Sequence, residues 1–160
     1  MNPASGGSIV EGATKENFYE LNRMHISDLM PKNTESMCIS AAIKILRNNN
    51  RKLKFIQSFA DERCGKFGIV YQAANFGYYG EHDATFWEFN GAMYHNIIMT
   101  AKRGKGGTME RILQENKHLA IRHDLRQFRY LYFVDKSWEC KCLLSRKPYE
   151  KHYLDNGSKQ

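Results

Sequence analysis

The fold is decided by a stretch that begins Leu21-Asn22-Arg23-Met24-His25-Ile26, continues through the loop Pro31-Lys32-Asn33-Thr34-Glu35-Ser36 and ends Ser58-Phe59-Ala60-Asp61. It reads as a strand, a polar loop, an amphipathic helix and a second strand. The loop of such a βαβ unit opens onto a helix N-terminus, where free backbone N–H groups and the helix dipole favour negative charge. The stretch therefore predicts an anion site, with a phosphate-bearing cofactor as the first candidate.

The helix of this unit has clear start and stop signals. Asn33 is a predicted N-cap, and Glu35 lies in the first turn, where the dipole favours an acid. The apolar face at helical spacing comprises Cys38, Ala41, Ala42 and Ile45, flanked by Ile39, Ile43 and Leu46. Asn48-Asn49-Asn50 ends the helix. We expect strands on either side of it, from Phe18 to Ile26 and from Leu53 to Ala60, the second apolar enough for the centre of a parallel sheet.

The rest of the chain predicts a helix, a hairpin, a further helix and a last strand. The segments are Ile69–Asn75 (helix), Thr85–Phe89 with Met93–Thr100 (hairpin around the turn Asn90-Gly91), Met109–Ile121 (helix) and Phe128–Val134 (strand). Together they predict an α/β fold: a mixed central sheet with flanking helices and a parallel centre between Phe18 and Ala60. We expect one domain over residues 8–154, between a flexible start at residues 1–7 and a polar tail at residues 155–160.

The composition and net charge of the chain indicate which classes of binding partner to expect. The chain has 160 residues, a net charge of +7 and a pI near 9.2, which favour a polyanion such as nucleic acid, although an ordinary basic protein would look the same. No apolar run approaches the ~20 residues of a membrane-spanning helix, so we expect no membrane partner. The four cysteines are too scattered for a disulfide scaffold, which favours the cytoplasm.

Several motifs in order carry a resemblance to a known family. They are Glu20-Leu21-Asn22-Arg23-Met24, Pro31-Lys32-Asn33-Thr34-Glu35-Ser36, Ser58-Phe59-Ala60-Asp61, Gly68-Ile69-Val70-Tyr71-Gln72-Ala73 and Arg129-Tyr130-Leu131-Tyr132-Phe133-Val134-Asp135. Between residues 9 and 151 the chain resembles the Mom family of phage and prophage DNA-modification enzymes, within the GCN5-related acyltransferase (GNAT) superfamily.

The resemblance implies a GNAT-like fold and a specific reaction. The family has an N-terminal portion with early strands and a His-Tyr motif, so we expect an N-terminally truncated version of its sheet. The family transfers a carbamoylmethyl group, derived from an acyl-CoA, to N6 of adenine in double-stranded DNA, which protects phage DNA from restriction. The implied cofactors are acetyl-CoA or another acyl-CoA, with iron as a possible addition, and the implied location is the cytoplasm of a bacterial host.

The same resemblance implies roles for the loop and for Tyr71, and their positions in the chain predict roles for Asp61 and Arg23. Ser36, Asn33 and Thr34 would hold the coenzyme pyrophosphate, and the alternative is a well-capped helix without a ligand. Asp61 would act as general base toward the adenine amine or bind metal, unless it is a turn residue.

Two further side chains complete the predicted catalytic set. Tyr71 would donate a proton to the leaving thiolate, and core packing is its alternative. Arg23 would orient the substrate or pair with Asp61, and its alternative is an outward-facing surface position.

Basic segments predict the contact with DNA. Lys102, Arg103, Lys105 and Arg126 are the predicted phosphate contacts, with Arg122 and Arg129 beside them, and a solvated face is the alternative. Four aromatic residues would either stack on a flipped adenine or fill the core: Tyr78, Tyr79, Phe86 and Trp87.

The remaining metal candidates are weak. Cys140-x-Cys142 would place two thiols on one strand face, but it lacks a second pair for zinc.

Two other functions stay open. One is a GNAT acyltransferase that acts on a small amine or a protein, and the other is an inactive, truncated nucleic-acid-binding remnant.

Overall fold

The computed structural model describes residues 9–22, 24–27, 29–62, 67–96, 98 and 108–149, and it divides into two compact units. Unit 1 is formed by the chain up to Glu81 and from Phe128 onward, and unit 2 by residues 82–127. The described elements are β1 (Phe18–Leu21), α1 (Thr34–Asn49), β2 (Phe55–Asp61), α2 (Ile69–Ala73), β3 (Gly77–Phe89), β4 (Ala92–His95), α4 (Thr108–Glu115), η2 (Lys117–Leu119), β5 (Ile121–Phe133) and η3 (Lys136–Lys141).

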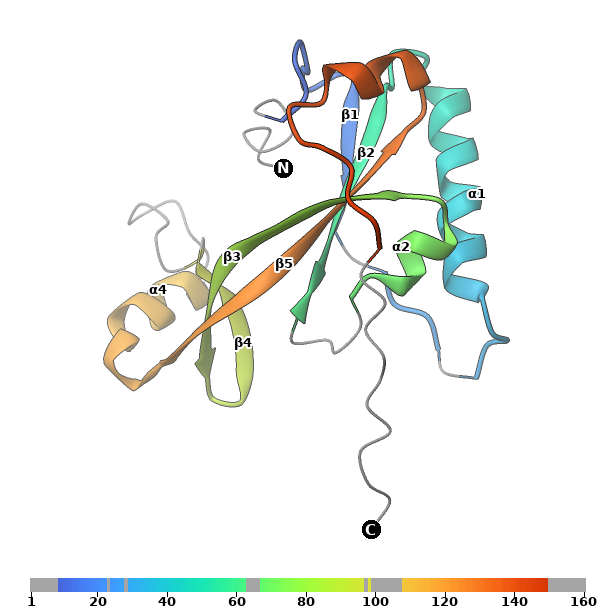
Figure 1. The fold of residues 1–160 in the computed structure, drawn as a ribbon. Helices are drawn as coiled ribbons and strands as arrows, with labels where there is room; N and C mark the ends of the chain where they lie inside the picture. The colour runs from blue at the N-terminus through green and yellow to red at the C-terminus, as the bar shows by residue number, and fades with distance from the viewer. Residues whose placement is uncertain are drawn as a thin grey trace. The chain divides into compact units, whose positions relative to one another are not determined.

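The described strands form one mixed sheet in the order β1-β2-β5-β3-β4, which confirms the predicted α/β class (Figure 1). Strands β1 and β2 are parallel, in a register that runs from Phe18↔Phe55 to Leu21↔Ser58. The predicted parallel pairing is therefore confirmed, but β1 is the terminal strand of the described order, so the pair lies at one edge of the described sheet and not at its centre. Strand β1 nevertheless ends at Leu21 rather than at Ile26, and Asn22, Met24 and His25 beyond it are exposed.

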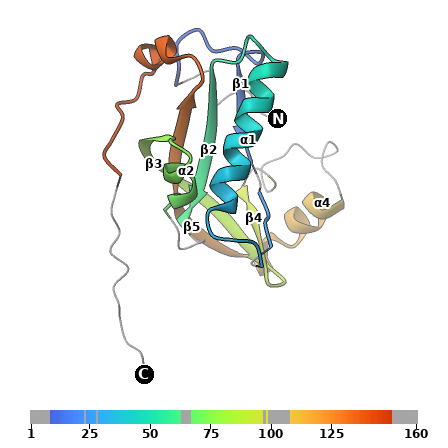
Figure 2. The ribbon, with the colours of Figure 1, turned by 90° about the vertical axis from the view of Figure 1, so that its right-hand side faces the viewer.

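Helix α1 covers one face of the sheet in unit 1 (Figures 1 and 2). Its buried residues are Ile39 and Ile43, which pack with Ile56 and Ala60 of β2. The middle of the predicted apolar face is not buried: Cys38, Ala41 and Ala42 are exposed, and Ile45 is 59% exposed, whereas the flanking Ile39 and Ile43 are buried. The helix carries two apolar stripes, and the one with larger side chains buries more apolar area. The helix ends at Asn49, as the asparagine run predicted.

The opposite face of the sheet in unit 1 has its own apolar cluster. Phe18 and Phe55 stack with ring centroids 5.1 Å apart, and Phe133 lies 5.8 Å from Phe55. Ile9, Val10, Tyr79 and Leu131 complete the buried cluster. The sheet in unit 1 therefore has a buried apolar cluster on each face, and α1 covers only one of these faces.

Unit 2 contains the predicted hairpin. Asn90 and Gly91 have φ values of 50° and 73°, and positive φ at both central residues is the type I′ pattern that suits a tight hairpin. Strand β4 ends at His95, before the predicted Thr100. The helix predicted up to Ile121 ends at Glu115, and Ile121 begins β5.

Candidate active site

The carboxyl end of the parallel pair is called open here because β2 extends beyond the last residue of β1, so the end of β2 has no partner in β1. The last paired residues are Leu21 and Ser58, whereas β2 continues to Asp61. Ser58 is fully buried and its Oγ donates a hydrogen bond to the carbonyl oxygen of Leu21, at 2.9 Å. The N-terminal turn of α1 lies at this same end of the sheet (Figure 1). Open α/β sheets bind ligands at the carboxyl ends of their strands.

The loop before α1 leaves the helix N-terminus uncapped. Asn33 occupies the N-cap position with φ of 70°, and its side chain makes no capping hydrogen bond. The hydroxyl of Thr34 donates to the carbonyl of Pro31 at 2.6 Å, and that of Ser36 to the carbonyl of Asn33 at 3.0 Å. Helix geometry leaves the N–H groups of Glu35 and Ser36 without an intrahelical carbonyl. The position of the predicted cap is confirmed, but its capping bond is not formed.

Asp61 is the last residue of β2 and is half-buried, as expected for a group at the carboxyl end of a strand. Side chains alternate along β2, so Asp61 shares the face of Phe55, Gln57 and Phe59, opposite α1. Arg23, its predicted partner, lies outside the described residues.

Tyr71 lies on α2, which packs beside α1. Its half-buried ring contacts Tyr130 at 5.4 Å and Phe76 at 5.7 Å between centroids. The hydroxyl of Tyr130 donates to the carbonyl of Phe67 and accepts from Nε2 of Gln72 at 3.1 Å. These contacts support the core-packing alternative for the Tyr71 ring.

A buried polar pair next to the open end was missed by the sequence analysis. Gln57 is fully buried, and its Nε2 donates to Oε2 of Glu20 across the parallel pair at 3.4 Å. The side chain of Arg129 lies over the ring of Phe59, 5.5 Å from its centroid. A glutamine within an otherwise apolar strand was the available signal, because a buried amide requires partners.

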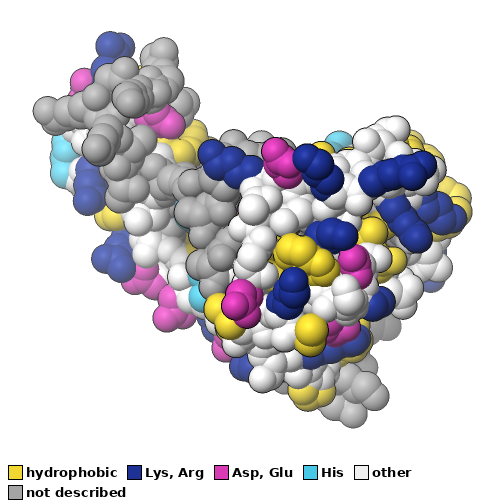
Figure 3. All heavy atoms as spheres, turned by 90° about the horizontal axis from the view of Figure 1, so that it is seen from above, with side chains coloured by type: hydrophobic (Ala, Val, Ile, Leu, Met, Phe, Trp, Pro, Cys, Tyr) yellow, Lys and Arg dark blue, Asp and Glu magenta, His cyan; other side chains and the backbone are white. Residues whose placement is uncertain are grey.

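The predicted DNA-contact residues are only partly described. Lys102, Arg103 and Lys105 lie outside the described residues. Arg126 is half-buried in β5, and Arg122 is exposed and pairs with Asp124 at 2.9 Å. Figure 3 shows Lys and Arg side chains gathered toward its right-hand side, the side on which α1 lies in Figure 1.

Three of the four aromatic residues proposed to stack on a base are core residues. Tyr78, Tyr79 and Phe86 are 3%, 4% and 2% exposed, so the stacking prediction is wrong for them. Trp87 is half-buried, and its Nε1 donates to Oδ1 of Asn96 at 2.9 Å. The ammonium of Lys117 lies 4.9 Å from the Trp87 ring centroid.

Metal and membrane sites are not found in the described part of the chain. Cys140 lies in η3 and Cys142 just after it, so the two thiols do not share a strand face as predicted. Within residues 9–149, apart from those left undescribed, no group of three or more His, Cys, Asp or Glu side chains is arranged to hold a metal ion. None of the described helices is long and apolar enough to cross a membrane.

These features define a mixed α/β protein with an open strand end beside an uncapped helix, compatible with a GNAT-like fold. Residues 1–151 match the model of the Mom protein family, and the chain belongs to that family. It is similar to the methylcarbamoylase Mom of Escherichia phage Mu, with 44% identity over 136 residues. The match covers 85% of this chain but 56% of the relative, so the chain spans little more than half of that protein's length.

Proposed function

We propose that this protein is a GNAT-like transferase that modifies N6 of adenine in double-stranded DNA, with an acyl-CoA as the donor in an acyl-transfer step on the way to a carbamoylmethyl group. Membership of the Mom family and the methylcarbamoylase relative support the class of reaction. The observation that carries the proposal is the opening of the sheet between Leu21 and Asp61, beside the N-terminus of α1.

The residues at the start of α1 suit a pyrophosphate group. Because the Asn33 side chain makes no capping bond, it does not compete for the N–H groups of Glu35 and Ser36. The Thr34 and Ser36 hydroxyl protons point to backbone carbonyls, so the backbone supplies the donors to the anion. When bound there, the coenzyme would supply an acyl carbon for attack by the adenine amine and a thiolate leaving group. That step forms an N6-acyl adenine, and conversion to a carbamoylmethyl group requires a further step with a nitrogen donor such as ammonia or an amine.

Two side chains would carry out the two proton transfers of the reaction: the carboxylate of Asp61 and the phenol of Tyr71. Asp61 would accept the proton that the adenine amine loses as the new bond to N6 forms, because it is a half-buried carboxylate at the strand end. Tyr71 would protonate the leaving thiolate, and its contacts with Tyr130 and Phe76 hold its ring on α2. The predicted iron has no assigned ligands among the described residues.

The test is mass spectrometry of nucleosides from the DNA of cells that express the chain. We expect a modified adenine nucleoside with the chain, and its loss with Asp61→Asn. Asp124→Asn is the matched control, because that exposed carboxylate pairs with Arg122 in unit 2. Unmodified adenine with the unaltered chain would contradict the proposal. Thiol release from acetyl-CoA with a small amine and without DNA would instead favour the general acyltransferase.

A further inference from the structure

Arg129 is a half-buried cation that lacks a counter-charge. Its Nε is buried without a hydrogen-bond partner, and no ion pair or hydrogen bond joins its guanidinium to another residue that the structure describes. Burial lowers the pKa of this guanidinium below its ordinary value, because the charged form loses hydration there. The contact with the Phe59 ring at 5.5 Å compensates only part of that loss.

The position of Arg129 relates it to the open end of the sheet. The Val134 N–H donates to the Lys54 carbonyl at 2.8 Å, and Arg129 lies over Phe59. Because these two contacts run in opposite directions along the neighbouring strands β2 and β5, the strands are antiparallel and Phe59 lies opposite Arg129. Phe59 lies two residues before Asp61 and on the same face of β2. Arg129 therefore lies one strand away from the predicted catalytic carboxylate.

The sheet face on which Arg129 lies decides whether its guanidinium could bind the coenzyme or another anion. Ile39 and Ile43 of α1 pack against Ile56 and Ala60, which point to one side of β2. Phe59 and Arg129 alternate with those positions and belong to the opposite side, with Phe55 and Phe133. The candidate coenzyme site at the N-terminus of α1 is thus associated with the helix-covered face, and Arg129 with the other.

We propose that Arg129 binds a phosphate of the DNA strand on the sheet face opposite α1, beside the carboxyl end of β2. The inference rests on the proposed action on DNA and adds a specific contact to it. A planar guanidinium matches two phosphate oxygens, and stacking on Phe59 fixes the orientation of its donors. The phosphate would supply the counter-charge that the described residues do not, and would position the strand near Asp61.

The experiment is a salt titration of DNA binding by fluorescence anisotropy, with a labelled duplex and the full chain. Arg129→Met should weaken binding about tenfold at low salt and reduce the slope of log K against log salt by about 0.9, which is one phosphate contact. Arg129→Lys should keep the slope but bind more weakly than the unaltered chain, because it retains the charge without the planar fork. Arg47→Met, which removes an exposed charge from α1, should leave the slope unchanged.

Two further readouts separate the possible outcomes. Arg129→Met should keep or raise the melting temperature, because it removes an unpaired buried charge, and should retain the thermal shift with coenzyme A. Unaltered DNA binding by Arg129→Met, or an equal change of slope in Arg47→Met, overturns the inference. Loss of the coenzyme A shift with intact DNA binding also overturns it, since the phosphate would then belong to the coenzyme. If the unaltered chain binds no DNA, the proposed function fails together with the inference.

Discussion

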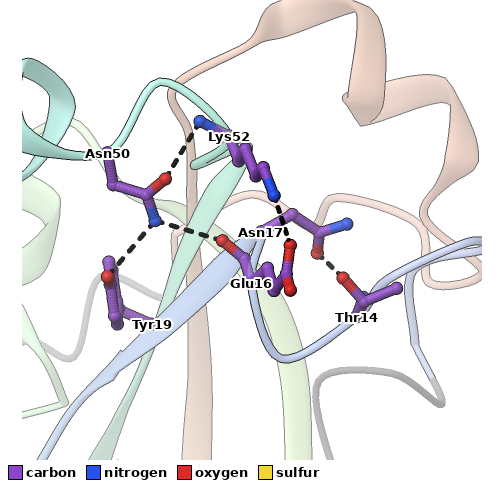
Figure 4. Close-up of polar contacts among 6 residues, drawn as sticks. All are labelled: Thr14, Glu16, Asn17, Tyr19, Asn50 and Lys52. Atoms are coloured by element: carbon purple, nitrogen blue, oxygen red, sulfur yellow. Dashed lines mark hydrogen bonds and ion pairs between the residues drawn. The ribbon is translucent and has the colours of Figure 1, made fainter.

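The two ends of the parallel pair β1–β2 are built in opposite ways. At the amino end, Asn50 Nδ2 donates to the Glu16 carbonyl at 3.1 Å and to the Tyr19 hydroxyl at 3.2 Å, while its Oδ1 accepts from the Lys52 N–H at 3.0 Å (Figure 4). Lys52 also pairs with Glu16 at 2.7 Å. Side chains thus fasten the end of α1 to the entry of both strands.

The carboxyl end has few such ties. Strand β1 stops at Leu21, β2 continues alone to Asp61, and Asn33 leaves the helix N-terminus uncapped. A ligand that binds at this end would supply contacts that the protein itself supplies at the other end. The comparison indicates that the amino end secures the fold, and our proposal assigns the chemistry to the carboxyl end.

The largest expected effect follows from removing the carboxylate at the open end. Asp61→Asn should reduce the modification of adenine by about 100-fold or more, because general base catalysis is lost, while the fold persists. Nucleoside mass spectrometry and circular dichroism measure the two effects. If the Asp61→Asn protein modified adenine as well as the unaltered chain does, Asp61 would not be the general base.

The next effect tests the packing that supports the open end. Gly68 precedes α2 with φ of 74°, and an added Cβ would lie 2.3 Å from Cε2 of Tyr130. Gly68→Ala should lower the free energy of unfolding by about 3 kcal/mol, through overpacking and the left-handed backbone. Gly12→Ala has a φ of 75° with no atom within 4 Å, so it should cost about 1 kcal/mol. Urea unfolding measures the free energy of unfolding of both variants. An equal decrease in the two would show that the contact with Tyr130 does not contribute to the effect of Gly68→Ala.

A smaller effect is expected at the fastened end. Asn50→Ala should lower the free energy of unfolding by about 1–2 kcal/mol, because it removes the hydrogen bonds to Glu16, Tyr19 and Lys52. Lys52→Ala is the control and should hardly change the melting temperature, since both partners of its ion pair are exposed. Asn50→Ala should leave the modification of adenine unchanged. If Asn50→Ala reduced the modification of adenine without lowering the free energy of unfolding, the amino end would have the functional role that we assign to the carboxyl end.

The smallest effect is a pH dependence at the fastened end. Hydrogen bonds from Ser137 and Lys54 lower the pKa of Asp135 to about 2. Its unfolded pKa is near 3.9, so the unfolded chain binds more protons between these values and the stabilisation is lost as the pH falls from about 4 to about 2. The unaltered chain should be more stable than Asp135→Asn at pH 5, and this difference should vanish near pH 2. Thermal melts across this range measure it, and a constant difference would contradict the assignment.

The sequence predicted element types well where a local signal acts alone. Asn48-Asn49-Asn50 ended the helix, and Asn90-Gly91 formed the hairpin, because these residues act through their own backbone preferences. The buried stripe of α1 could not be singled out, since Ile39 and Ile43 compete with Cys38 and Ile45 and periodicity cannot rank two apolar stripes.

The candidate site was predicted only in part. Asp61 and Asn33 fell at the expected ends of their elements, because strand and helix boundaries have local signals. The Glu20–Gln57 bond and the unpaired Arg129 depend on register between strands, which a single sequence does not state.

Hydrogen–deuterium exchange with and without acetyl-CoA tests the contrast between the two ends most directly. We predict slower exchange in the segments 33–37 and 59–61, at the open end, and no change in the segment 50–54, at the fastened end. Slower exchange confined to the segment 50–54, or no change at either end under saturating coenzyme, would contradict the assignment of ligand binding to the carboxyl end of the parallel pair.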